Sequence, residues 1–142
     1  MNRQIEFRGK RLDNGEWVYG YYVENKLGNH FIYEIERNGE FVWNSYEVDP
    51  STVGQFTGLV DKNGKRIYEG DFIQSNKSKY NRFNKDGIYE VYFNEFLCHF
   101  ALVDSSVEWH KKHGAYDDYS LTGAKTKDFE VIGTIYDKEN IE

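Results

Sequence analysis

The sequence predicts a mainly β protein of antiparallel strands, and two observations lead to this prediction. Polar and apolar residues alternate with a period of two in the runs 4–8, 31–36, 88–93 and 129–136. Such alternation, filled with aromatic and β-branched residues, is typical of strands with one buried face. Turn dipeptides lie between these runs, at Asn14-Gly15, Asn38-Gly39, Asn63-Gly64 and Asp86-Gly87. Because Asn, Asp and Gly tolerate positive φ, we expect the strands to be joined as hairpins.

In chain order, residues 1–74 are expected to form a barrel-like β part and residues 88–137 a second β part. Residues 75–87 are rich in Lys, Asn and Ser, and they are predicted to form a polar loop. No linker rich in proline, or in glycine and serine, separates the two β parts. We therefore expect one domain over residues 1–142.

Two local patterns refine this prediction. Gly70-Asp71 opens the apolar pair Phe72-Ile73, a feature similar to SH3-like barrels, and this is an analogy of fold alone. Residues 104–114 predict one short helix, with a serine cap at the start and a glycine at the end. Asn94-Glu95 predicts a hairpin turn between residues 89–93 and 96–103.

Composition limits the possible partners and the compartment. The chain has 142 residues, with 24 acidic and 18 basic side chains, and a net charge of −6. This balance argues against duplex DNA binding, which needs many neutralised phosphates. No apolar run is long enough to span a membrane, and no signal-peptide pattern is present. The single cysteine, Cys98, cannot form an internal disulfide, and its apolar neighbours predict a buried structural thiol. We therefore expect a cytoplasmic protein without membrane association.

One block carries a family resemblance. Residues 53–73, VGQFTGLVDKNGKRIYEGDFI, strongly resemble the signature of the YopX family, whose members are small proteins encoded by phages and prophages of bacteria. Residues 5–10 and 15–20 are similar to the N-terminus of that family, and residues 130–136 to its C-terminal strand. Phe72 and Thr134 depart from the family pattern, in which a smaller aliphatic residue and Asn are commoner. The resemblance implies a phage or prophage origin and a shared fold, but it implies no activity.

The same block is either scaffold or a binding surface. In the second case the candidate binding residues are Gln55, Thr57, Tyr68, Glu69, Asp71 and, outside the block, Trp17. Glu69 and Asp71 could also act as paired acids on a small ligand, which is the enzyme hypothesis. We favour a structural turn, in which the Asp71 carboxylate accepts backbone N–H bonds.

Aromatic and basic residues suggest an alternative. Trp17, Tyr19 and Tyr21 share one face of a predicted strand, where they could stack single-stranded bases or hold a peptide. We favour packing in a core or between two sheets for these three rings. Two basic clusters could face phosphates, but we favour a solvated surface for both: Arg3, Arg8, Lys10 and Arg11, and Lys77, Lys79, Arg82 and Lys85. Twelve tyrosines exceed what a core of this size needs, so some should lie at a contact surface.

No catalytic, metal or cofactor site is expected. His99, His110 and His113 could bind zinc together with Asp117 or Asp118, but no cysteine pair or His-Glu-x-x-His pattern supports such a site, and we favour chance spacing. The expected function is a non-enzymatic module that binds an unidentified host or phage protein. The alternatives are single-stranded nucleic-acid binding and an enzyme using Glu69 and Asp71. Self-association through an exposed strand edge is also compatible with the sequence.

Overall fold

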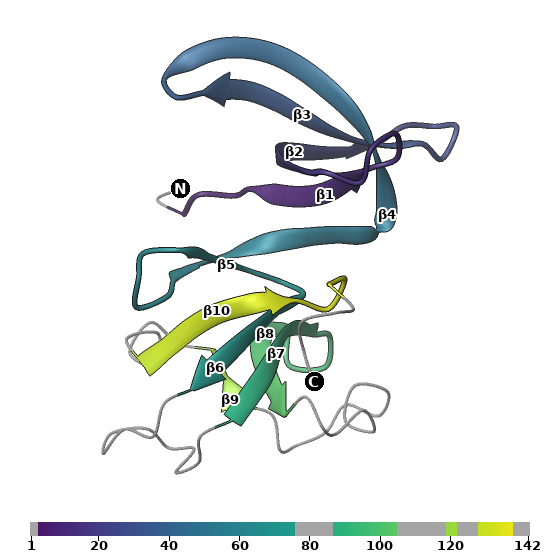
Figure 1. Ribbon diagram of the computed structural model, residues 1–142. Coiled ribbons are helices and arrows are strands. Elements are labelled where there is room, and N and C mark those ends of the chain that lie inside the picture. The colour runs from purple at the N-terminus through teal and green to yellow at the C-terminus, as the bar shows by residue number, and fades with distance from the viewer. Residues whose placement is uncertain (1–2, 76–86, 105–118, 122–127, 138–142) are drawn as a thin grey trace. The chain divides into compact units, whose positions relative to one another are not determined.

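The computed structural model describes residues 3–75, 87–104, 119–121 and 128–137 (Figure 1). Within these residues the strands are β1 (Phe7–Arg11), β2 (Trp17–Glu24), β3 (His30–Arg37), β4 (Glu40–Val60), β5 (Arg66–Tyr68), β6 (Asp71–Ser75), β7 (Gly87–Asn94), β8 (His99–Asp104), β9 (Tyr119–Ser120) and β10 (Phe129–Thr134). The strands form two sheets and their pairings are antiparallel, which confirms the predicted fold class. The described residues contain no helix long and apolar enough to span a bilayer.

The predicted hairpin turns are confirmed wherever the structure describes them. Gly15, Gly39 and Gly64 each adopt a positive φ in the turns that follow β1, β3 and β4. The predicted hairpin between β7 and β8 also forms, with its turn at residues 95–98. The polar loop, except for its first and last residues, and the short helix, except for its first residue, lie outside the described residues. The SH3-like character stays a prediction.

The expectation for Cys98 was wrong. Its side chain is exposed, because it ends the turn of residues 95–98 with a φ of +55° rather than lying in a strand. The Asn94 side chain accepts the N–H groups of Phe96 and Leu97 at 3.0 and 3.1 Å. These bonds bend the apolar run outward, away from the sheet.

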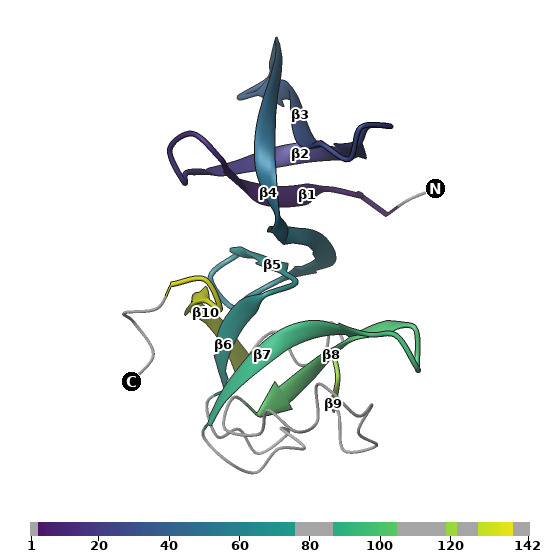
Figure 2. The same cartoon turned by 90° about the vertical axis from the view of Figure 1, so that its right-hand side faces the viewer.

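The chain divides into two compact units, Met1–Phe56 (unit 1) and Thr57–Glu142 (unit 2), and the expectation of a single domain stays a prediction. In unit 1 the strands pair in a closed circuit, because β1 is bonded to both β2 and β4 while β3 joins those two strands (Figure 2). The buried core of this unit is Val18, Ile32 and Val48. Phe7, Tyr22, Tyr46 and Val53 pack around it.

The circuit of unit 1 depends on a change of partner along β2. The first half of β2 pairs with β1 as far as Gly20, opposite Phe7, and the second half pairs with β3 from Tyr21, opposite Tyr33. A Cβ atom on Gly20 would lie 2.1 Å from the Tyr33 carbonyl oxygen, and the φ of Gly20 is +154°. Only glycine fits where the two backbones approach so closely.

Unit 2 has a larger core beneath the sheet β10-β6-β7-β8-β9. The buried apolar residues of this core are Ile67, Ile73, Tyr89, Val91, Leu102, Phe129 and Val131. The turn between β4 and β5 covers the outer edge of β10, because the Lys62 N–H donates to the Phe129 carbonyl at 2.9 Å. This cover hides an edge that could otherwise pair with another strand.

Asp61 holds that turn together. Its Oδ1 accepts the N–H groups of Asn63 and Lys65 at 2.8 and 2.9 Å, and its Oδ2 accepts the N–H of Val131 in β10 at 2.9 Å. Burial by itself would raise the pKa of Asp61, but these three bonds, assisted by the charge of Lys65, outweigh burial and lower it. The ionised carboxylate therefore stabilises unit 2.

We predict that Gly20→Ala destabilises the protein by more than about 3 kcal/mol, because the new methyl group meets backbone rather than a mobile side chain. Gly28→Ala is the matched control. Gly28 also has a positive φ, of +79°, but nothing lies within 4 Å of the point that a Cβ atom would occupy there. This control should lose only about 1–2 kcal/mol. Urea unfolding followed by tryptophan fluorescence measures both, and equal losses would contradict the steric argument.

We predict that Asp61→Asn costs about 1–3 kcal/mol near neutral pH, because three backbone N–H groups lose an anionic acceptor. The folded-state pKa of Asp61 is below its ordinary value of 3.8. Its contribution is therefore complete above that value and is lost as the pH falls through the folded-state pKa. Urea unfolding at a series of pH values should show a shallower acid dependence for the variant than for the wild type. A curve for Asp61→Asn that runs parallel to the wild-type curve would contradict the assignment.

Candidate functional site

Most of the predicted binding residues of the signature block, residues 53–73, are part of the hydrogen-bonded or buried structure of unit 2. Thr57 donates its hydroxyl to the Ile67 carbonyl at 2.8 Å. Tyr68 is buried, and its N–H donates to the Asp71 carboxylate at 2.7 Å. Asp71 is only 1% exposed, whereas Glu69 is half-buried. The prediction that Asp71 accepts a backbone N–H at this turn is confirmed, and the bond accounts for its place in the motif.

Gln55 and Trp17 belong to unit 1 and lie at different ends of β1. Gln55 is half-buried opposite Phe7, and Trp17 is opposite Lys10. The guanidinium of Arg8 lies 4.5 Å from the centre of the Trp17 ring, and the Lys10 ammonium lies 5.2 Å from it. Trp17 therefore carries cation–π contacts within its own unit.

Basic side chains of the N-terminal cluster also make contacts within unit 1. Arg8 is buried, so the expected solvated surface was wrong for this residue. Arg11 forms a two-point ion pair with Asp13, at 2.6 and 2.9 Å, and its guanidinium lies 4.5 Å from the centre of the Tyr46 ring. These contacts hold Arg8 and Arg11 against side chains of unit 1. The second basic cluster lies outside the described residues.

A different surface gathers the exposed aromatic side chains of unit 1. Tyr19, Tyr21, Tyr33, Phe41 and Trp43, on strands β2 to β4, are between 42% and 76% exposed, and we call them the outer aromatic face. Tyr21 and Tyr33 stand directly opposite each other across β2 and β3. Core packing was the wrong interpretation for Tyr19 and Tyr21, because the small core is filled from the opposite face of the sheet. The prediction of exposed tyrosines is confirmed.

Trp43 reaches this face through an irregularity in β4. The register between β3 and β4 passes from Glu34 opposite Asn44 to Glu36 opposite Phe41, so two residues of β4 oppose one of β3. Trp43 lies in this bulge with a φ of +51°. Its ring stacks on Phe41, with ring centres 6.2 Å apart and planes at 17°.

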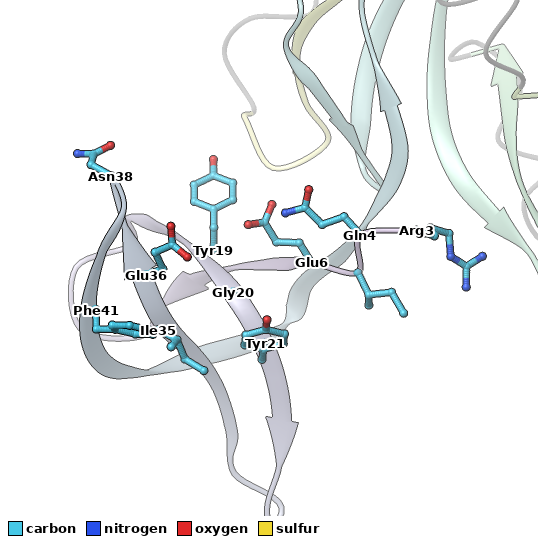
Figure 3. Close-up of a pocket in the computed structure, with 11 residues that line it drawn as sticks. Arg3, Gln4, Glu6, Tyr19, Gly20, Tyr21, Ile35, Glu36, Asn38 and Phe41 are labelled. Carbon is cyan, nitrogen blue, oxygen red and sulfur yellow. The ribbon is translucent and has the colours of Figure 1, made fainter. Parts of the chain in front are cut away.

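A pocket of about 650 Å³ adjoins the outer aromatic face. It is lined by Arg3, Gln4, Ile5, Glu6, Tyr19, Gly20, Tyr21, Ile35, Glu36, Asn38 and Phe41. Figure 3 shows its walls coming from the segment before β1, from the middle of β2 and from the end of the β3–β4 hairpin. The sequence predicts an aromatic stripe that includes Tyr19 and Tyr21, but no pattern in it points to Phe41, Trp43 or the pocket itself.

Metal-binding geometry is absent from the part of the chain that the structure describes, where no three His, Cys, Asp or Glu side chains come close enough to hold an ion. His110 and His113, which are candidate metal ligands in the sequence, lie outside that part. His99 is described, and its ring contacts the Phe100 carbonyl at 3.0 Å.

Comparison with known proteins identifies the family. No curated protein matches the chain. Among solved structures, the crystal structure of protein EF1440 from Enterococcus faecalis is similar, with a TM-score of 0.56 and 18% sequence identity, over 99% of this chain and 100% of that one. This likeness shows a shared fold. The sequence model of the YopX protein family matches residues 6–141, which is nearly the whole chain. The chain therefore belongs to the YopX family.

Proposed function

We propose that this chain is a non-enzymatic accessory protein of a phage or prophage, which acts in the cytoplasm of the bacterial host by binding another protein. The origin and compartment rest on the family resemblance and on the composition. The binding role rests on one observation, which is the outer aromatic face of unit 1.

The exposed rings gathered on strands β2 to β4 support protein binding on energetic grounds. Tyr, Trp and Phe are enriched where proteins meet, and they dominate the binding energy of interfaces. Trp43 is 74% exposed although its positive φ costs about 1–3 kcal/mol for a residue with a side chain. A strained strand residue that presents a large ring to solvent is typical of a functional surface.

The charges around the face favour protein over nucleic acid. Strands β2 and β3 and the first part of β4 carry five glutamates, at positions 24, 34, 36, 40 and 47, and one arginine, Arg37. Arg37 is already paired with Glu34 at 2.6 Å. These glutamates repel phosphates, and the basic residues of the neighbouring strand β1, Arg8 and Lys10, lie against the Trp17 ring, so we disfavour stacking of single-stranded bases on these rings.

We predict that the double variant Tyr33→Ser/Trp43→Ser loses the protein partner while staying folded. Affinity capture from host cytosol should recover a specific protein with the wild type, and at least about tenfold less of it with the variant, as expected for loss of two interface rings. Leu27→Ser is the control, because Leu27 is 86% exposed in the same unit but lies in the turn between β2 and β3. Equal recovery with the double variant would overturn the proposal, and unchanged urea unfolding shows that loss of binding is not loss of fold.

We predict no retardation of single-stranded oligonucleotides in a gel-shift assay at about 50 mM salt, a condition under which phosphate contacts are strong. A shift that disappears with rising salt, and that Tyr33→Ser/Trp43→Ser abolishes, would instead make the outer aromatic face a nucleic-acid platform.

A further inference from the structure

The pocket of unit 1 lies beside an open strand edge. Pairing between β2 and β3 runs from Glu24 opposite His30 to Tyr21 opposite Tyr33 and stops there. Among the described strands, residues 34–37 of β3 are paired with β4 alone. Ile35 and Glu36 of this stretch line the pocket together with Tyr19 and Tyr21 of β2. An edge of this kind can pair with an extended segment of another chain.

The side chains around the pocket favour a cation. Two carboxylates, those of Glu6 and Glu36, and one cation, Arg3, line it. Figure 3 shows the Arg3 side chain directed away from the other lining residues, whereas the carboxylates of Glu6 and Glu36 lie on either side of Tyr19. The rings of Tyr19, Tyr21 and Phe41 add electron-rich faces. Carboxylates beside aromatic faces attract guanidinium and ammonium groups.

We propose that this pocket binds a basic side chain, arginine in preference to lysine, from an extended segment of the partner protein that pairs with the open edge of β3. This inference rests on the proposed function and specifies the partner segment. The cavity of about 650 Å³ exceeds the needs of a single ion and accommodates a side chain with its neighbours.

Arginine suits the pocket better than lysine for a geometric reason. A planar guanidinium stacks on an aromatic ring while its N–H groups pair with a carboxylate. The residues that flank it alternate between the two sides of the added strand. One side meets the outer aromatic face, so we expect aromatic or β-branched neighbours at every second position.

A displayed library of random twelve-residue peptides, selected on the full chain, tests the proposal directly. Enriched sequences should contain a basic residue, arginine more often than lysine, within an extended, β-branched or aromatic context. The strongest binder is then remade with citrulline, the neutral analogue of arginine, at the basic position. We expect roughly tenfold weaker binding of the citrulline peptide, because it keeps the shape and loses the charge. Enrichment of sequences without a basic residue, or equal affinity of the two peptides, would overturn the proposal.

Variants of the chain locate the site. Glu36→Gln should weaken the arginine peptide roughly tenfold and the citrulline peptide little, whereas Glu40→Gln, on the same hairpin but outside the pocket, should change neither by more than about twofold. Tyr19→Ser should weaken binding of the arginine peptide, whereas Tyr19→Phe, which keeps the ring, should bind it as the wild type does. Unchanged binding by Glu36→Gln would overturn this inference. If Glu36→Gln still captures the partner protein and Tyr33→Ser/Trp43→Ser does not, the proposed function is supported and the inference about the basic side chain is wrong.

Discussion

The close backbone approach at Gly20 is the constraint on which unit 1 depends. A Cβ atom there would lie 2.1 Å from the carbonyl oxygen of Tyr33, so glycine allows β2 to exchange its partner β1 for β3 at this residue. The exchange closes the circuit of strands around a small core of buried apolar residues, Val18, Ile32 and Val48. The same exchange leaves residues 34–37 of β3 without β2, beside the pocket. Fold and candidate site therefore share one physical cause.

The signature block has a different role from the candidate site. Thr57, Asp61 and Asp71 use their side chains to fix turns of unit 2, through bonds to backbone groups at 2.7–3.2 Å. Buried bonds of this kind specify a fold, because an unsatisfied backbone group inside a protein is costly. The outer aromatic face lies between residues 19 and 43, outside that block. The block carries the family resemblance of the sequence, and a separate surface is the candidate for function.

Much of this architecture could be predicted, because its signals are local. Asn-Gly dipeptides mark turns by their tolerance of positive φ, and alternation marks the strands. The sequence Glu69-Gly70-Asp71 was enough to predict that the Asp71 carboxylate accepts a hydrogen bond from a backbone N–H group. Each of these inferences needs only neighbouring residues.

The features that could not be predicted depend on contacts between residues that are distant in the sequence. Tyr19 and Val18 lie on opposite faces of β2, and both faces are apolar, so the sequence does not say which one fills the core. Burial of Arg8 follows from the register that brings Trp17 across from β1. Trp43 lies in a bulge, which is a property of the pairing of β4 with β3 rather than of β4 alone. The pocket lies where β2 separates from β3, and no local sequence pattern indicates this separation.

Site-specific photo-crosslinking in the bacterial host tests the central claim most directly, which is that function resides in the outer aromatic face. A benzoylphenylalanine residue replaces Phe41 in one variant and Phe96 in another; Phe41 is 76% and Phe96 77% exposed, but Phe96 lies in the turn between β7 and β8 of unit 2. The account predicts a discrete crosslinked protein product from position 41 and none from position 96. A product from position 96 alone, or the same products from both positions, would contradict it.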